Sequence, residues 1–366
     1  MALDPRSLAW ARLAGKPLPQ RVLVALLRHF GTPQALLAAS RSELSRAVSP
    51  AAADVVLASE DPGQLERISR WLDDPGHHVV AWDDDDFPRA LLEVGTAPPA
   101  FFYIGRRDLL GRPALGIVGS RHATPQGVEN AREFARALGT AGLTIVSGLA
   151  LGIDAAAHEG ALGTPGATLA VVGTGPDRVY PARNRDLAAR IARGGGILSE
   201  FVPGTPPRKE NFPRRNRLIS GLSRGVLVVE ATLSSGSLIT ARLAGEQGRD
   251  VFAIPGSIHS PFAKGCHKLI REGAKLVETA QDVLAELHFA SAMAPTVHAA
   301  AREDASTPPL LTAMGYDPVG VDALVARTGL APESVIRDLV TLELAGDVAS
   351  LPGGLWQRRA PGQQPA

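Results

Sequence analysis

The chain has 366 residues, which is long for one domain and predicts two or three. It contains 38 glycines and only 5% aromatic residues, a composition that favours an α/β core over a β-sandwich. The single cysteine, Cys266, excludes an internal disulfide and a cysteine-based zinc site. No apolar run approaches the ~20 residues of a membrane span, and the N-terminus lacks the pattern of a secretory signal. We therefore expect a cytoplasmic protein without a membrane segment.

The net charge of the whole chain is +1, but the charge is unevenly distributed. Residues 101–290 have 23 Lys and Arg against 16 Asp and Glu, a net of +7 (23 − 16). The flanks, 1–100 and 291–366, have 15 basic and 21 acidic residues, a net of −6 (15 − 21). A basic centre favours a polyanionic ligand for the middle of the chain. Chance clustering of solvated charge is the alternative.

Residues 1–75 are expected to form a bundle of short helices. Apolar residues recur at near-helical spacing from Val22 to Leu27, and Gly31 then ends the helix. Thr32 and Pro33 start the next one. Short helices with glycine-containing turns are typical of SAM-like or helix-hairpin-helix bundles, which either contact DNA backbone or only pack against a neighbouring domain.

Residues 76–290 are expected to form the second and largest domain. It begins with a strand at 78–82, followed by four aspartates at 83–86. Consecutive carboxylates in a turn point in different directions, so we interpret the run as a solvated turn and not as a metal site.

From residue 113 onward, short apolar segments alternate with helical patterns. This alternation predicts a mostly parallel sheet with helices on both faces. The expected strands are 115–118, 143–147, 168–172, 196–199, 225–230, 250–254 and 275–277. The expected helices are 126–141, 152–163, 184–193 and 237–247.

The remaining residues divide into an Ala- and Pro-rich linker at 291–308 and a small domain at 309–360. Two helical patterns, the second opening at Pro332, precede a hairpin pattern around residues 346–356, which predicts a winged helix. The second helix would read DNA in such a fold, yet it offers Arg337 against Glu333, Asp338 and Glu343. This balance favours contact with protein over contact with DNA.

Turns rich in glycine and serine follow several of the expected strands. The carboxyl ends of parallel strands lie at one edge of a sheet, so the backbone amides and hydroxyls of these turns can converge on one anion. Arg121 adds a full positive charge to the first of them. The four turns are Gly119-Ser120-Arg121, Ser147-Gly148 with Gly152-Ile153-Asp154, Gly173-Thr174-Gly175 with Arg178 to Pro181, and Ser234-Ser235-Gly236-Ser237.

A basic segment at residues 211–217, which we interpret as a loop, lies between the third and fourth turns. Its arginines suit bidentate contact with phosphate, and Phe212 offers a ring on which a base can stack. The alternative is a solvated basic turn in which Phe212 anchors the core.

No catalytic signature is present. Ser120, Asp154, His158 and Glu230 could be imagined as a hydrolytic set, with Asp154 and His158 on one helical face. The chain nevertheless lacks a nucleophile elbow, a Walker motif, a His-Glu-x-x-His motif and a dinucleotide fingerprint. We therefore expect a binding protein that is not an enzyme and needs neither cofactor nor metal.

An ordered series of motifs resembles the DNA-processing protein A (DprA/Smf) family of bacteria. The resemblance is dense from about residue 80 to 290, and the flanking helical bundle and winged helix look like the family's variable additions. The series comprises Gly119-Ser120-Arg121; Ser147-Gly148-x-Ala150-x-Gly152-Ile153-Asp154-x-x-x-His158; Asp177-Arg178-x-Tyr180-Pro181-x-x-Asn184; Phe212-Pro213-x-Arg215-Asn216-Arg217; Glu230-Ala231-x-x-x-Ser235-Gly236-Ser237-Leu238-x-Thr240-Ala241; Pro255-Gly256; and Gly265-Cys266-His267-x-Leu269-Ile270.

This resemblance implies that the central domain has an extended Rossmann-like fold. It also implies a non-enzymatic protein that binds and shields single-stranded DNA and loads the recombinase RecA onto it during natural transformation. It also implies a homodimer formed through His267, Ile270 and Leu276. Arg183 and Arg185 stand where relatives often have lysine. The DNA-binding residues expected from the motifs are Gly119, Ser120, Arg121, Gly148, Arg183, Phe212, Arg214, Arg215, Asn216, Arg217, Ser235, Gly236 and Ser237.

Two other functions fit the glycine-rich turns less well. A nucleotide-processing enzyme of the phosphoribohydrolase type would need a Pro-Gly-Gly-x-Gly-Thr-x-x-Glu signature, and the nearest segment here is 235–238. A nucleotide-sensing scaffold would use the winged helix as its output.

Overall fold

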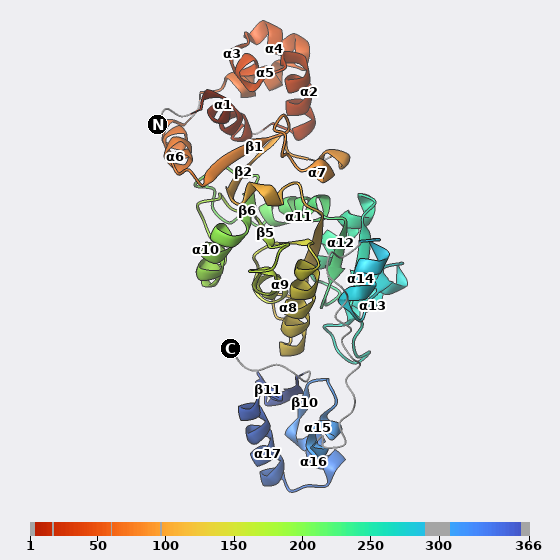
Figure 1. Ribbon diagram of the computed structural model, residues 1–366. Coiled ribbons are helices and arrows are strands. Elements are labelled where there is room, and N and C mark those ends of the chain that lie inside the picture. The colour runs from red at the N-terminus through yellow and green to blue at the C-terminus, as the bar shows by residue number, and fades with distance from the viewer. Residues whose placement is uncertain (1–3, 17, 60, 96, 290–307, 360–366) are drawn as a thin grey trace.

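The computed structural model describes residues 4–16, 18–59, 61–95, 97–289 and 308–359 (Figure 1). Within them it has the expected α/β class: an N-terminal helical bundle, a large mostly parallel sheet covered by helices, and a C-terminal winged helix. The linker expected at 291–308 lies outside the described residues except for Pro308. None of the described helices is long and apolar enough to cross a membrane.

The N-terminal bundle consists of six short helices, and all but α2 start at a capping side chain. Ser40 and Glu43 form a reciprocal capping box, and Thr32 and Asp61 cap helices that begin with proline. The bundle packs against β1 and β2 through a shared core that includes Trp10 and Phe102. Its helices are α1 (Pro5–Ala14), α2 (Gln20–Phe30), α3 (Pro33–Ala38), α4 (Arg41–Ala47), α5 (Pro50–Leu57) and α6 (Pro62–Leu72).

The central sheet has nine strands in the order β1-β2-β6-β5-β4-β3-β7-β8-β9. The last seven in this order are parallel, and β1 and β2 extend the sheet as an antiparallel pair on β6. The strands are β1 (His77–Ala81), β2 (Ala100–Gly105), β3 (Ala114–Val118), β4 (Thr144–Ser147), β5 (Thr168–Val172), β6 (Gly196–Ser199), β7 (Gly225–Val228), β8 (Asp250–Ala253) and β9 (Lys275–Leu276).

The chain reverses its direction across the sheet at β3. From β3 it proceeds outward through β4, β5 and β6, and it then returns to place β7 on the other side of β3. Open α/β sheets bind ligands at the carboxyl ends of strands where the order reverses in this way. The topology therefore places the turns after β3 and β7 at the favoured ligand position.

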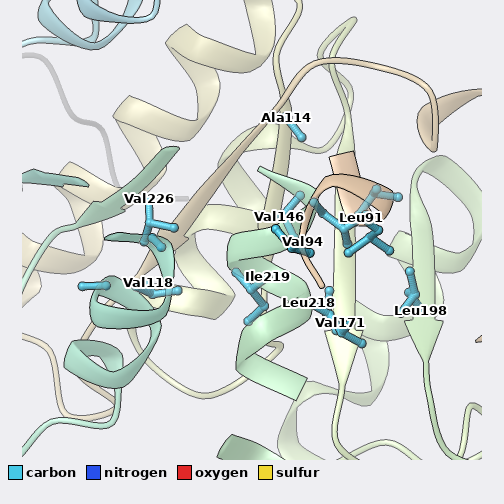
Figure 2. Packing of buried hydrophobic residues seen from close by; sticks show 14 of the residues in the cluster. Leu91, Val94, Ala114, Val118, Val146, Val171, Leu198, Leu218, Ile219 and Val226 are labelled. Carbon is cyan, nitrogen blue, oxygen red and sulfur yellow. The ribbon is translucent and has the colours of Figure 1, made fainter. Parts of the chain in front are cut away.

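Helices cover both faces of the sheet. Helices α8 (Pro125–Thr140), α9 (Ile153–Ala161) and α14 (Ala280–Glu286) contribute to the core on one face. On the other face lie α7 (Arg89–Glu93), α11 (Asn211–Leu222), α12 (Ser237–Glu246) and α13 (Lys264–Arg271). Figure 2 shows Leu91 of α7 and Leu218 and Ile219 of α11 packed over the sheet residues Val146 and Val171. Helix α10 (Arg185–Gly194) packs near β5 and β6, and 3-10 turns occupy Arg107–Leu109 and Ala182–Asn184.

The expected loop at 211–217 is wrong, because these residues form the first half of α11. Pro213 is compatible with this position, since the first amides of a helix have no partner within the helix. Gly116 of β3 lets α11 pack closely, since an added Cβ would lie 3.4 Å from Ile219 of α11 and 3.3 Å from Ser223, the residue after it. A basic segment thus becomes a helix whose residues point in several directions.

The C-terminal unit is a winged helix with its own apolar core, which includes Leu324, Val335 and Leu339. A three-stranded sheet in the order β10-β12-β11 forms the wing. The expected second helix and hairpin are both present. The elements are α15 (Pro309–Met314), β10 (Val319–Gly320), α16 (Val321–Thr328), α17 (Pro332–Ala345), β11 (Val348–Leu351) and β12 (Leu355–Arg358).

Candidate nucleic-acid interface

A groove of about 650 Å³ lies at the carboxyl ends of β3 and β7. The turn after β3, the N-terminal half of α11 and the N-terminus of α12 line it. Nine of the expected binding residues meet there: Gly119, Ser120, Arg121, Phe212, Arg215, Asn216, Ser235, Gly236 and Ser237. Turns far apart in the sequence therefore do converge on one site.

The turn after β3 is held rigidly against the residues that follow β7. The Ser120 amide donates to the Glu230 carbonyl at 2.8 Å, and the Glu230 carboxylate accepts bonds from the Thr124 amide and hydroxyl at 2.9 and 2.6 Å. Burial raises the pKa of Glu230. Gly119 permits this close approach, because an added Cβ would lie 2.9 Å from the Glu230 carbonyl oxygen. Glu230 thus fixes the turn after β3 at the edge of the groove.

The expected arginines separate into exposed and buried groups. Arg121 is exposed, and its guanidinium carbon lies 5.7 Å from the centre of the Phe212 ring. Arg214 is also exposed, over Phe201 and 3.8 Å from Glu200, but it does not line the groove. Arg183 is exposed on the 3-10 turn before α10 and likewise lies outside the groove lining.

Arg215 lies at the floor of the groove, with only 4% of its surface exposed. It donates to the Val171 carbonyl, and burial lowers its pKa to about 10. Gly148 is close beneath the same guanidinium, since an added Cβ would overlap Arg215. Nearby Asp154 accepts from the Gly148 amide at 3.1 Å, and burial raises its pKa. Arg215 and Gly148 therefore support the floor, and the surface charge lies elsewhere.

Arg217 is also largely withdrawn from solvent. Its guanidinium pairs with Glu200, and the two side chains are 14% and 12% exposed. Burial lowers the pKa of Arg217. The three arginines of the basic segment thus have three different environments, because successive positions of a helix lie on different faces.

The N-terminus of α12 opens into the groove without a side-chain cap. Gly236 occupies the cap position, and the Ser237 hydroxyl is buried without a hydrogen-bond partner among the described residues. Thr232 and Ser235 hold the preceding turn through a bond of 3.1 Å from the Thr232 amide to the Ser235 hydroxyl. The Leu238 and Ile239 amides donate to the Ser235 and Gly236 carbonyls at 3.2 and 3.1 Å, so the positive helix end and the Ser237 hydroxyl are what make this a receptive position for an anion.

Two aromatic rings lie beside the cations. Tyr180 and Phe212 both line the groove, with their ring centres 5.6 Å apart and their planes tilted by 39°. Flat rings next to positive charge can accept both a base and its phosphate.

The imagined hydrolytic set does not assemble. His158 bonds through Nδ1 to the Thr168 hydroxyl at 2.7 Å and does not pair with Asp154, while its Nε2 has no partner in the described chain. Burial, with a smaller effect from Arg215, lowers the pKa of His158 to about 3. Ser120 accepts from the His122 amide at 3.1 Å. These groups have structural roles here.

The aspartate run at 83–86 was expected to be a solvated turn, which is wrong for Asp84. Its side chain is only 14% exposed and lies 2.8 Å from Arg6 and 3.4 Å from Arg107. Arg107 also pairs with Asp86 at 2.5 Å. The run thus joins the N-terminal helix to the sheet. Within the described ranges, no cluster of three or more His, Cys, Asp or Glu could hold a metal ion.

Comparison with known proteins shows which family the chain belongs to. The model of the family described as DNA recombination-mediator protein A matches residues 78–288, more than half of the chain. The chain belongs to this DprA family. A second model, the DprA winged helix domain, matches residues 294–354. The resemblance seen in the motifs is thereby confirmed, and both DprA regions match in the expected order.

Individual DprA relatives agree with the family match. Protein Smf of Escherichia coli is 43% identical over 298 residues, which cover 79% of this chain and 80% of that protein. The crystal structure of DprA from Streptococcus pneumoniae has a TM-score of 0.68 and 40% identity, and the match covers 76% of this chain and 97% of that one. DprA from Helicobacter pylori has a TM-score of 0.53 and 32% identity, covering 57% and 95%, and its structure is described as showing a single-stranded DNA binding mode.

Sequence reasoning missed several groove residues of this DprA-family chain, among them a cation and an aromatic ring. Lys209 is an exposed cation at the groove, and Tyr180 is its second aromatic ring. Tyr180 belongs to the motif that begins at Asp177, and an aromatic ring close to a glycine-rich turn could have indicated a place for a base to stack. Lys209 precedes α11 and follows three prolines at 203, 206 and 207, and nothing in its local pattern distinguishes it from other surface lysines.

The residues expected to form the dimer lie together near one edge of the sheet. His267 and Ile270 belong to α13, and Leu276 belongs to the edge strand β9. Leu276 is 44% exposed, whereas Ile270 is partly buried against the core. His267 Nε2 lies 2.9 Å from the Gly256 carbonyl oxygen.

Proposed function

We propose that this chain binds single-stranded DNA in the groove between the turn after β3 and the N-terminus of α12. The observation that carries the proposal is the combination of exposed Arg121 and Lys209, the uncapped end of α12, and the rings of Tyr180 and Phe212. These features serve the two parts of a nucleotide, since cations and amides bind phosphate and rings stack on bases. The single-stranded DNA binding mode described for the H. pylori relative supports it.

An unpaired strand suits this groove better than a duplex. The bases of a duplex are stacked inside it, so they cannot reach the Phe212 ring without being displaced, which costs free energy. An unpaired strand already presents its bases to an aromatic surface. We therefore expect Phe212 to favour single strands, with Arg121 and Lys209 supplying the salt-sensitive part of the affinity.

The proposed role is that of a binding protein and not an enzyme. Glu230, Asp154 and His158, the three acid–base groups considered for a hydrolytic set, hold backbone or side-chain hydroxyl partners. We propose that the bound strand is shielded in the cytoplasm and transferred to RecA during natural transformation, as the family resemblance implies. The test is the rate at which RecA assembles on a single strand: this chain should accelerate assembly, and an unchanged rate would contradict the loading role.

We propose that the chain forms a homodimer through His267, Ile270 and Leu276. A dimer would make contact with the second groove intramolecular and so raise the avidity for a long strand. Leu276→Arg is the sharper variant, because Leu276 is 44% exposed whereas Ile270 packs against the core. Light scattering should show a monomer for this variant and a dimer for the unaltered chain. A variant that remains dimeric would refute this interface.

The binding proposal is tested by fluorescence polarisation with labelled single- and double-stranded oligonucleotides of one sequence, across a salt series. We expect tighter binding to the single strand and a linear fall of log affinity with log salt concentration. Mononucleotides serve as competitors. Preferential binding of a free nucleotide would favour the sensor alternative, and release of a base from a nucleoside monophosphate would favour the enzyme alternative.

A further inference from the structure

A second hollow adjoins the groove on the far side of Tyr180. Its volume is about 360 Å³, within the range of small-ligand pockets, and Thr174, Arg178 and Arg185 contribute to its lining. Tyr180 lines both the groove and this hollow, with 47% of its surface exposed. The two spaces therefore share Tyr180 as a common wall.

The charge of the second hollow suits an anion. Arg178 and Arg185 are both exposed, and neither lies within ion-pair distance of a carboxylate in the part of the chain that the structure describes. The lining has one acidic member, Asp177, and its Oδ1 accepts from the Gly204 amide at 2.8 Å. The lining thus has two cations and one carboxylate, and this carboxylate already accepts a hydrogen bond.

The loop that forms this hollow is fixed in place by hydrogen bonds at both ends. Near its start, the Thr174 hydroxyl donates to the Arg178 carbonyl at 2.6 Å, and the Gly175 amide donates to the Thr205 carbonyl at 2.9 Å. At its end, Asn184 Nδ2 donates to the Leu149 carbonyl at 2.9 Å. A loop held in this way loses little conformational entropy when it binds a ligand.

We propose that the hollow beyond Tyr180 is an additional nucleotide subsite, which takes a phosphodiester of the same unpaired polynucleotide strand. Arg178 and Arg185 contact the phosphate, and the exposed Tyr180 ring stacks with the base at the boundary between the two spaces. This inference rests on the proposed function of the groove and extends it. It makes the binding track longer than the groove alone.

The test compares the double variant Arg178→Ala/Arg185→Ala with a control that has the same change in net charge. The control is Arg190→Ala/Arg193→Ala, which removes two exposed arginines of α10 that do not line the hollow. Polarisation titrations use a series of thymidine oligonucleotides of increasing length. We expect a loss of about tenfold with long oligonucleotides for the test variant, because the two exposed cations share one phosphate and solvent screens both contacts.

Length dependence separates the subsite from general electrostatic attraction. The shortest oligonucleotide that the groove binds should lose little affinity, and the affinity of the test variant should stop rising at a shorter length than that of the unaltered chain. Equal losses at all lengths, or equal losses in the control, would overturn the subsite alone. Absence of single-strand binding by the unaltered chain would overturn the proposed function and the subsite together.

A second pair of variants tests whether a base stacks on the Tyr180 ring. Tyr180→Phe should retain affinity for long oligonucleotides, and Tyr180→Ala should lower it by about tenfold, because only the former keeps a stacking surface. Equal affinity of the two variants would contradict the role proposed for Tyr180.

Discussion

The groove of the central domain and the winged helix are both parts of folds that often bind nucleic acid, yet their surfaces have opposite chemistry. The groove displays Arg121 and Lys209 beside two aromatic rings. On the winged helix, α17 exposes an apolar row of Ile336, Val340 and Leu344, and Leu344 is 83% exposed. Residues 308–359 have four arginines against six acidic residues. A fold provides a shape, and the placement of charge on it decides whether it attracts a polyanion.

The comparison also shows that the number of basic residues in a segment does not tell how many of them expose their charge to solvent. Arg215 and Arg217 belong to the most basic segment of the chain, but both are withdrawn from solvent and bonded within the protein. Their contribution to binding is therefore to hold the groove in shape, and the counterion release expected on binding DNA must come from the exposed cations.

The largest expected effect comes from removing the two exposed cations of the groove. Arg121→Ala/Lys209→Ala should lower the affinity for a single strand by about 100-fold, since two charge-assisted contacts are lost. It should also reduce the salt slope by about 1.4. Polarisation titrations measure both quantities. Arg190→Ala/Arg193→Ala is the control with the same charge change, and equal losses in the two variants would reject the groove as the site.

The buried side chain of His158 should make the free energy of unfolding of the central domain decrease in acid. The pKa of His158 is about 3 in the folded chain and about 6.5 when unfolded, so between these values only the unfolded state takes up a proton. Stability should therefore fall as the pH drops from 6.5 toward 3. Relative to His158→Gln, the unaltered chain should lose about 2 kcal/mol between pH 7 and pH 5.

Urea unfolding at the two pH values measures this difference. The winged helix, with no histidine between residues 308 and 359, offers no corresponding group. If the unaltered chain and His158→Gln lose the same free energy of unfolding on acidification, His158 does not cause the sensitivity. His29→Gln, a change at an exposed residue of α2, serves as the control.

A smaller effect is expected from removing the stacking ring. Phe212→Leu keeps an apolar side chain at the start of α11 but loses the flat surface, so affinity for a single strand should fall by about tenfold. The preference for single over double strands should fall with it, because cations do not distinguish the two. A variant with lower affinity but unchanged preference would show that the ring does not select single strands.

The smallest effect is expected in the winged helix. Arg337 is an exposed arginine of α17, the helix that would enter the major groove of DNA. Arg337→Glu should change the affinity for a single strand by less than about twofold, whereas the equal charge reversal Arg121→Glu should abolish most of it. Comparable losses in the two variants would erase the contrast between the regions.

Much of the fold could be predicted because the strands have a simple pattern. Short apolar segments alternating with helical patterns predicted the parallel strands from 114 to 253, and the turns after them were expected to meet because parallel strands end at the same edge. Strand β2 was missed, although Phe101, Phe102 and Tyr103 follow two prolines and have strong strand propensity.

The site was predicted less completely than the fold. Which side of α11 faces the groove depends on how the helix packs on β3, so the burial of Arg215 could not be read from local sequence. Its partner, the Val171 carbonyl, is 44 residues away in the chain. The role of Lys209 depends in the same way on tertiary structure.

The most direct test of the contrast is photo-crosslinking of the full chain to a single-stranded oligonucleotide with photoreactive bases, followed by mass spectrometry of the linked peptides. We expect adducts at Phe212 and Tyr180, the rings that line the groove, and few in peptides from 308–359. Adducts concentrated on α17, with none at either ring, would contradict the account.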